Sequence, residues 1–205
     1  GALTRFSFLD DNGSGLALPL TFPQQSSSTG PIAASVLDRT IEANAQLIME
    51  STGPTTATQL IGSGLLQSNG AVSGFGIFSN AALGWNAVVP LETRNASNYI
   101  LAFDNTNGLV TGVAIANLST TAANVPVIIR DDTGAQIGTT TISLPAQGHQ
   151  SFMLNAQYSS TSNLRGTIEF DTPQGGQITV LGKLIELARD TLPAAKRLVA
   201  LNDPR

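Results

Sequence analysis

Few side chains in this chain could perform acid–base or metal chemistry. Its 205 residues include one histidine, His149, and no cysteine. An imidazole titrates near neutral pH, so His149 could act as a general base beside a suitable acid, with Asp131, Asp132 and Glu50 as candidate partners. An exposed turn residue is the simpler interpretation of its place after Gly148. The absence of cysteine excludes disulfides, thiolate zinc sites and cysteine nucleophiles.

Two pairs of acids precede glycine turns, Asp10-Asp11 and Asp131-Asp132. Carboxylate and backbone oxygens are the ligands that calcium prefers, so these pairs, with Asp104, are candidate calcium ligands. The segment after Asp10 begins like a calcium loop but lacks the glutamate that closes an EF-hand. Aspartate is also favoured in tight turns, so solvated turn acids are the preferred interpretation. No other cofactor is expected.

Other catalytic patterns are incomplete. Ser63 and Ser73 have glycine neighbours, but neither completes a Gly-x-Ser-x-Gly motif before a helix. A carboxylate pair for glycoside hydrolysis would be drawn from Glu50, Glu92 and Glu169, and the sequence does not show how far apart these lie.

Aromatic residues could provide a stacking platform for sugar rings, and the candidates are Trp85, Tyr99, Tyr158 and the eight phenylalanines. Aromatic residues make up 5% of the chain, however, and most are expected in the core. Polysaccharide therefore remains one candidate partner among others.

The composition narrows the class of protein. Charged residues make up 12% of the chain, about half the usual share, and the net charge is −4. No basic stripe is present, so we expect no nucleic-acid partner. Uncharged polar residues suit β-sheet faces and extracellular surfaces. No apolar run approaches the roughly 20 residues that span a bilayer, and no signal peptide is recognised, so an exported protein would be represented here in a trimmed form.

The elements that must position these residues are mostly strands. Segments rich in Val, Ile, Thr and Phe alternate with clusters of Gly, Asn, Asp and Pro. Strands are predicted at 4–9, 15–22, 45–50, 59–67, 71–79, 86–91, 98–103, 109–117, 124–131, 136–144, 149–154, 164–170 and 177–182. Polar loops are predicted at 23–31, 51–58 and 155–163. Apolar spacing predicts a C-terminal helix at 183–190, ending before Pro193, then a final strand at 196–204. Segment 34–40 is a second candidate for a short helix.

The order of these segments repeats, which indicates an internal duplication. The matching segments are 3–13 with 125–134, 40–45 with 142–148, 60–63 with 164–167, and 71–76 with 177–182. We therefore expect an all-β fold of antiparallel β-sandwiches with one short C-terminal helix. The predicted units are a first half, 1–92, that lacks its opening strand, a second half, 93–182, and a tail, 183–205.

Several sequence segments of the chain resemble a family of uncharacterised β-sandwich modules in secreted bacterial proteins, often from soil bacteria. These segments are Phe103–Gly108, Gly112–Asn117, Leu164–Phe170 and Trp85–Glu92. The resemblance covers about residues 1–182, implies an extracellular β-sandwich, and brings no catalytic residues. The tail, 183–204, instead resembles a fragment of the periplasmic substrate-binding proteins of ABC transporters, which suggests a chimera.

An incomplete first half would need another strand. The tail segment Leu198–Pro204 is similar in pattern to Gly112–Ser119, whose counterpart in the first half would precede residue 1. Because an open apolar sheet edge is costly, we expect the tail to fill that position, within the chain or by exchange in a homo-oligomer. Deletion of residues 194–205 should then cause aggregation or loss of cooperative unfolding.

These observations favour a non-catalytic extracellular structural or adhesion-type module that associates with itself by strand exchange. The alternative is a hydrolase of low specificity, acting on esters or phosphoesters, with its site at a sheet edge or dimer interface and His149 as its base. A carbohydrate-binding module is the third interpretation. An extracellular or periplasmic location is expected in each case.

Overall fold

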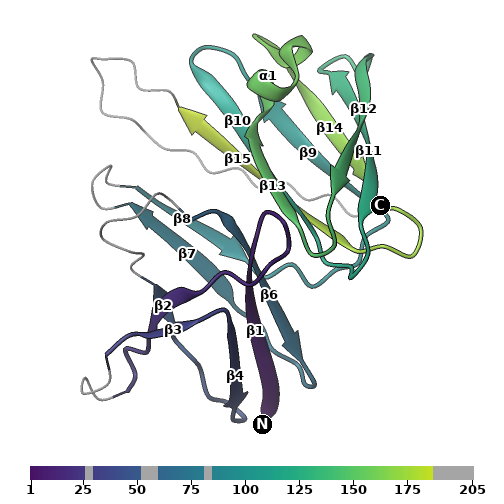
Figure 1. The fold of residues 1–205 in the computed structure, drawn as a ribbon. Coiled ribbons are helices and arrows are strands. Elements are labelled where there is room, and N and C mark those ends of the chain that lie inside the picture. The colour runs from purple at the N-terminus through teal and green to yellow at the C-terminus, as the bar shows by residue number, and fades with distance from the viewer. Residues whose placement is uncertain (26–29, 52–59, 81–84, 187–205) are drawn as a thin grey trace.

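Antiparallel strands dominate the computed structural model, which describes residues 1–25, 30–51, 60–80 and 85–186 (Figure 1). The side chains of Asn80, Trp85 and Glu186 are also outside that description. The strands are β1 (Ala2–Asp10), β2 (Leu18–Thr21), β3 (Ile32–Ala34), β4 (Val36–Ile41), β5 (Glu50–Ser51), β6 (Gly62–Ser68), β7 (Phe75–Asn80), β8 (Trp85–Pro90), β9 (Asn98–Asp104), β10 (Leu109–Asn117), β11 (Ala123–Asp131), β12 (Gln136–Leu144), β13 (His149–Met153), β14 (Arg165–Asp171) and β15 (Ile178–Glu186). The predicted all-β fold is confirmed.

The second half of the chain is a β-sandwich. One sheet has the order β12-β11-β14-β9 and the other the order β13-β10-β15. Alternate residues of β11, namely Val125, Val127 and Ile129, are buried between the sheets, as expected for strands with one wet face. Strand β9 closes one side, because it pairs with β14 and also lies against β15 and β10 of the other sheet.

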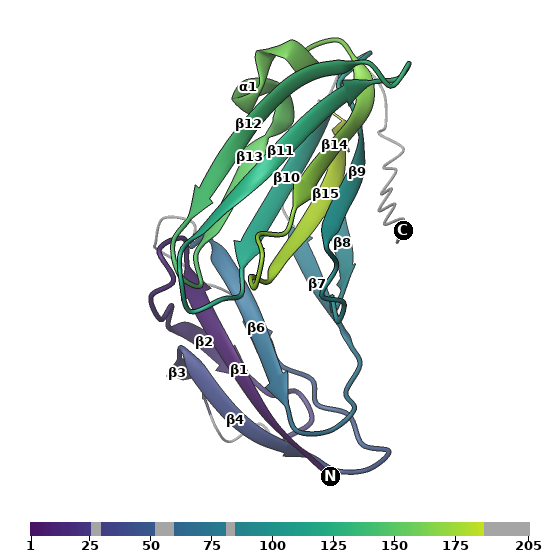
Figure 2. The same ribbon diagram turned by 90° about the vertical axis from the view of Figure 1, so that its right-hand side faces the viewer.

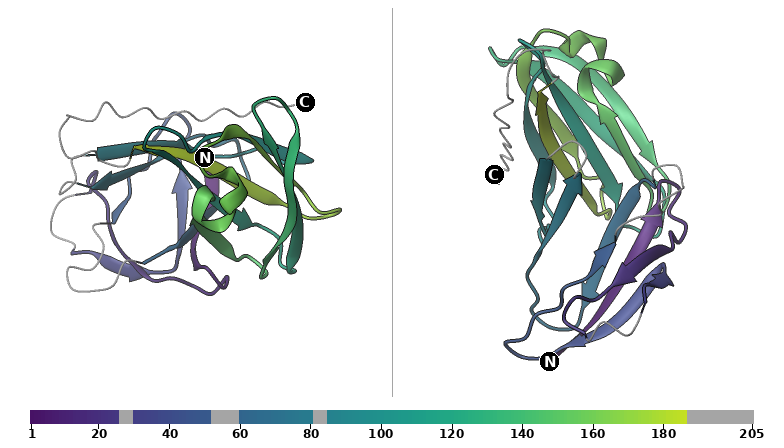
Figure 3. Two further views of the ribbon diagram at one scale, coloured as in Figure 1. Left: turned by 90° about the horizontal axis from the view of Figure 1, so that it is seen from above. Right: turned by 90° about the vertical axis from the view of Figure 1, so that its left-hand side faces the viewer.

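The first half has three smaller sheets, ordered β4-β1-β6, β3-β2-β5 and β7-β8. Figures 2 and 3 show the two halves stacked end to end, with β1, β4 and β6 in one layer and β7 and β8 in another. The buried apolar cluster between the sheets of the second half consists entirely of residues from 99 to 180. The first half contributes nothing to it, although Leu20 and Leu37 are individually buried.

The register of the main sheet repeats between the halves. Asp10 of β1 lies opposite Gly62 of β6, as Asp131 of β11 lies opposite Gly166 of β14. A Cβ on Gly62 would collide with the carbonyl oxygen of Leu9, and Gly166 meets the carbonyl oxygen of Arg130 in the same way. Thus β6 occupies the place of β14, and β1 that of β11.

The turns repeat as well. Gly13 and Gly134 both have positive φ angles, 80° and 86°, which glycine adopts at no steric cost. The backbone N–H groups of Asn12 and Ser14 donate to Oδ1 of Asp10 at 2.9 Å each. The equivalent groups of Thr133 and Ala135 donate to Oδ1 of Asp131. Both acids are therefore turn residues of one repeated hairpin.

The helix predictions are wrong where the structure describes them. Residues 183–186 continue β15, because Leu109 to Gly112 of β10 pair with them along their length, and cross-strand pairing overrides a short helical spacing. The rest of that predicted helix and the final strand at 196–204 lie outside the described residues. Segment 34–40 forms β3 and β4, and of the strand predicted at 45–50 only Glu50 is in a strand.

The helical residues of the described chain begin at the last residue of the strand predicted at 149–154 and continue into the loop predicted at 155–163. There α1 (Leu154–Gln157) is followed by a 3-10 turn at Ser159–Thr161. Leu154 is fully buried in the sandwich core, so packing rather than helix propensity holds this single turn in place. No helix of the described residues is long and apolar enough to cross a membrane.

Candidate functional site

The single histidine lies where the two halves meet. Its backbone N–H donates to the carbonyl oxygen of Asp11, and its ring Nδ1 lies 2.8 Å from Oδ1 of the same residue. The His149 side chain is 9% exposed and that of Asp11 is 51% exposed. Interpretation as an exposed turn residue is therefore wrong: His149 begins β13 and joins the turn after β1 to the turn before β13.

His149 and Asp11 are arranged like two of the three members of a catalytic triad, the base and its orienting acid. A carboxylate at Nδ1 fixes the tautomer that leaves Nε2 as the basic nitrogen. The hydrogen bonds of the described residues bring no serine or threonine hydroxyl to His149. The acids expected beside it, Asp131, Asp132 and Glu50, belong to other strands and turns, and Asp131 is hydrogen-bonded within its own turn. The acid that the structure supplies is Asp11.

The first acid of each pair accepts hydrogen bonds from the backbone of its own turn. Asp10 and Asp131 each accept two backbone N–H groups. A side-chain hydrogen bond from Thr133, followed by backbone hydrogen bonds, holds the pKa of Asp131 below its usual value. Among the described residues no three His, Cys, Asp or Glu side chains gather where they could hold a metal ion. The calcium ligands considered above are thus spread over separate turns.

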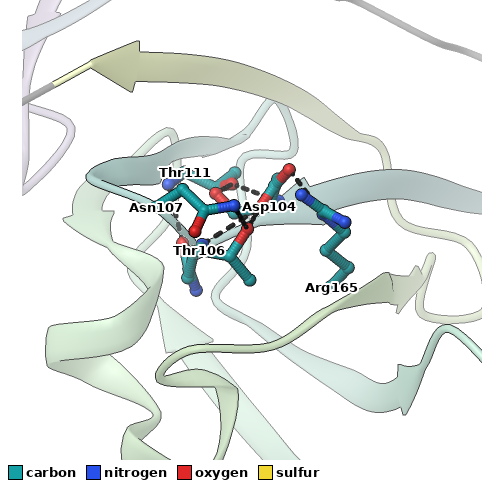
Figure 4. Close-up of polar contacts among 6 residues, drawn as sticks. Asp104, Thr106, Asn107, Thr111 and Arg165 are labelled. Atoms are coloured by element: carbon teal, nitrogen blue, oxygen red, sulfur yellow. Dashed lines mark hydrogen bonds and ion pairs between the residues drawn. The ribbon is translucent and has the colours of Figure 1, made fainter.

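A second polar cluster surrounds the turn between β9 and β10 (Figure 4). Asp104 accepts the N–H and hydroxyl of Thr106 on one oxygen and Nε of Arg165 on the other, at 2.7 to 2.9 Å. Burial acts most strongly on the Asp104 carboxyl and raises its pKa, but these hydrogen bonds together outweigh it and lower the pKa. The backbone N–H of Asp104 donates to the Thr111 hydroxyl.

The cluster extends inward through a buried asparagine. The Nδ2 of Asn105 donates to the carbonyl oxygen and the hydroxyl of Thr161, and its Oδ1 accepts the N–H of Thr111. In the described residues no buried side-chain nitrogen or oxygen lacks a partner. The buried groups of this cluster are therefore paired with one another, and they fix the turn against its neighbours.

Four further candidates, Glu92, Glu169, Tyr99 and Tyr158, make contacts of their own. Glu92 binds Arg94, and Glu169 binds Arg130 at 2.6 Å. Tyr99 is buried, with its hydroxyl donating to the carbonyl oxygen of Arg94. Tyr158 packs edge-on against the ring of Phe152. Trp85 lies in β8, but its side chain is outside the described residues. Neither tyrosine is thus an exposed ring on which a sugar could stack.

Several of the most exposed apolar side chains of the described residues lie on β7 and β8. Phe75 and Ile77 of β7 are 66% and 60% exposed, and Val88 of β8 is 49% exposed. Ile77 lies opposite Val88 and Phe75 opposite the exposed Pro90, so these four side chains share one side of the two-stranded ribbon. We call Phe75, Ile77, Val88 and Pro90 the ribbon face.

The other side of the ribbon is also incompletely covered. Ala87 is buried there, whereas Phe78, which lies opposite Ala87, is 60% exposed. Along the main sheet, β14 has neighbours on both edges, β11 and β9, whereas β6 pairs with β1 alone within the described residues. The interior of the first half is therefore open beside β6.

No motif of the sequence marks this surface, but the distribution of charged residues indicates it. From Ser51 to Leu91 the chain contains no Asp, Glu, Lys, Arg or His. That stretch includes β6, β7 and β8. A run of 41 uncharged residues in a chain with exposed strand edges is typical of an interaction surface rather than a solvated one.

Comparisons of the chain with protein-family models, with curated proteins and with solved structures found no match. The resemblance to secreted bacterial modules and the chimeric origin of the tail therefore stay predictions.

Proposed function

We propose that this chain is a non-catalytic structural or adhesion-type β-sandwich module, of extracellular or periplasmic origin, that associates with itself. The observation that carries the proposal is the exposed, uncharged ribbon face of the first half. The largest contiguous apolar patch on a protein surface is often functional, so the ribbon face is a candidate interaction site. The low charge content and the abundant uncharged polar residues suit an exported protein.

The absence of charge on the ribbon favours a second copy as partner. Nucleic acid, anionic lipid or an acidic peptide would be recognised by cationic side chains, and β6, β7 and β8 contain none. Two copies of a chain with net charge −4 repel each other, and an uncharged patch lets them meet where that repulsion is smallest. A two-fold dimer places the patch on its own image.

The ribbon face is too small to form such an interface by itself. Its four side chains offer on the order of 400 Å² of apolar surface, judged from the 150–250 Å² that one large aromatic side chain buries. A stable interface buries about 800 Å² on each partner. Self-association therefore requires a further contact between copies.

The proposal is tested by light scattering coupled to size-exclusion chromatography, over a series of concentrations of the full chain. We expect a dimer mass that falls toward the monomer on dilution. Ile77→Lys places a cation in the ribbon face of both copies and should shift the chain to monomer. Thr140→Lys, at an exposed position on β12, is the matched control and should leave the dimer intact. A wild-type monomer at all concentrations contradicts the proposal.

A hydrolase is the second candidate, supported by the 2.8 Å contact of His149 with Asp11. If this pair were a general base and its orienting acid, the chain would hydrolyse activated esters or phosphoesters. Asp11→Asn and His149→Ala would then each reduce the rate by at least about 100-fold, the usual contribution of a general base. The structural proposal expects no turnover above the buffer rate in any of the three proteins.

A further inference from the structure

We propose that the free edge of β6 binds residues 196–202 of a second copy as an added strand, in the place that β9 takes beside β14. This inference rests on the proposed self-association and names the contact that the ribbon face lacks. It also changes the position expected from the sequence. The sequence places the tail at the first-half counterpart of β10. That place is already taken: β7 is the counterpart of β15, and β7 pairs with β8 in the antiparallel sense in which β15 pairs with β10.

The place of β9 is well defined in the second half. Its residues Tyr99, Leu101 and Phe103 are buried, and Leu101 lies opposite Ile168 of β14. Leu101 also packs onto Gly182 of β15, since a Cβ there would lie 3.1 Å from Leu101 Cδ1. Strand β9 thus seals the gap between the two sheets at their edge.

No strand among the described residues lies at the same position in the first half. Gly64 of β6 is the counterpart of the fully buried Ile168, because each lies two residues beyond the matched glycines. A Cβ on Gly64 would meet no atom within 4 Å. Phe78 of β7, which should line the same interior, is largely exposed. A strand laid along β6 would cover both positions.

The tail carries the pattern of β9. The run Leu198-Val199-Ala200-Leu201-Asn202 follows Ile100-Leu101-Ala102-Phe103-Asp104 position by position: three aliphatic or aromatic side chains, a shared alanine and a final small polar residue. In this alignment Val199 and Leu201 take the buried places of Leu101 and Phe103, and Ala200 faces outward as Ala102 does. The two residues before the run depart from the pattern: Lys196 takes the place of Asn98, and Arg197 takes that of the buried Tyr99. Both would lie at the far end of β6, beside Leu66 and Gln67.

The edge of β6 is chemically suited to accept a strand. Its seven residues, Gly62 to Ser68, include no proline and no charged side chain. Natural edge strands usually carry such residues to prevent pairing, because unpaired backbone N–H and C=O groups bind any extended chain that fits. Addition of a strand to an edge of this kind draws most of its affinity from main-chain hydrogen bonds.

The length of the chain favours donation from another copy. β15 begins at Ile178, next to the junction of the halves, and runs away from it to Glu186. A strand antiparallel to β6 must enter beside Gln67, at the far end of the first half. The nine residues 187–195 span at most about 33 Å. To reach β6 of the same chain, they would have to run the lengths of β15 and β6, roughly 30 Å and 20 Å. This segment is too short for that path, and donation of the strand to a second copy avoids the problem.

Cysteine cross-linking tests the proposed register, because the chain has no cysteine of its own. Thr167 of β14 lies opposite Ala102 of β9, so Ser63 of β6 should lie opposite Ala200 of the donor strand. Opposite residues of an antiparallel pair are within the Cα separation that a disulfide spans. The full-length variants Ser63→Cys and Ala200→Cys are purified reduced, mixed in equal amounts, oxidised and analysed on a non-reducing gel.

We expect the mixture to give a heterodimer joined through positions 63 and 200, identified by mass spectrometry of its linked peptides. Each variant alone should give at least tenfold less covalent dimer. Gln67→Cys replaces Ser63→Cys as the control out of register by four residues, and should cross-link at that lower level. Far-ultraviolet circular dichroism of each reduced variant establishes that it is folded.

Three results would overturn the inference. In the first, a Ser63→Cys/Ala200→Cys double variant forms its disulfide within one chain, and the mixture gives no heterodimer. The tail would then pair with β6 of its own chain instead of a second copy. A chain that light scattering shows to be dimeric but that gives no 63–200 cross-link retains the proposed self-association and rejects this strand. A monomer without the cross-link rejects both.

Discussion

Two glycines of β6 provide a sharp test of the strand register. A Cβ on Gly62 would collide with the carbonyl oxygen of Leu9, so Gly62→Ala forces β1 and β6 apart at a point where the two strands pair. Overpacking of this kind costs about 1–3 kcal/mol, and the loss of neighbouring ladder bonds adds to it. Gly64→Ala enters open space and should stabilise the chain by about 0.5 kcal/mol, because alanine restricts the unfolded state.

Urea unfolding followed by tryptophan fluorescence measures the stability of the first half, where both glycines lie. The chain has one tryptophan, Trp85, and it lies in β8 of the first half. With a slope of about 1 kcal/mol per molar urea for a unit of this size, a loss of about 2 kcal/mol moves the midpoint of Gly62→Ala down by about 2 M. Gly64→Ala should move it slightly upward.

The opposite order of the two midpoints would refute the register of β1 and β6, and with it the equivalence of β6 and β14. Equal midpoints would do the same, since the two substitutions are chemically identical and differ only in what lies next to them. Gly166→Ala repeats the test in the second half, where the carbonyl oxygen of Arg130 takes the place of that of Leu9.

Three further predictions concern the junction, the turn acids and the tail. His149→Ala removes a hydrogen bond to a half-exposed carboxylate and should destabilise the chain by about 1 kcal/mol, visible as a lower melting temperature in calorimetry; an unchanged melting curve would mean that the halves do not depend on this contact. Folding lowers the pKa of Asp104, so its contribution is present above the ordinary pKa of an aspartate and is lost as the pH falls through the lowered value. Asp104→Asn should therefore flatten the acid limb of stability against pH below about 4, and a limb of unchanged slope would contradict that assignment. Deletion of residues 194–205 should expose the β6 edge and cause concentration-dependent aggregation, which turbidity on warming would detect; a soluble truncation that melts like the full chain would contradict a role for the tail.

Local sequence was sufficient for four consecutive strands of the second half, β9 to β12. The strands predicted at 98–103, 109–117, 124–131 and 136–144 correspond to β9 to β12 within a residue or two, because alternation of apolar residues and turn residues such as Gly134 act over short distances. The matching of segments 3–13 and 125–134 also corresponds to a shared register in the structure.

Prediction failed where distant contacts decide the outcome. Residues 183–186 are a strand because β10 pairs with them, and Leu154 is helical because the core of the sandwich holds it. The His149 side chain is largely shielded from solvent where it meets Asp11, which lies in a turn 138 residues earlier in the chain. No window of sequence contains these pairs of residues.

The sequence by itself therefore determined the β class, the repeated hairpins and the conformation of turns at Asp10 and Asp131, since these depend on neighbouring residues. Tertiary structure alone decided that Asp11 and not Asp131 accompanies His149, and that Phe75 and Ile77 are exposed rather than buried. The physical reason is that burial depends on whether another strand covers a residue. For β6 and β7, no strand among the described residues provides that cover.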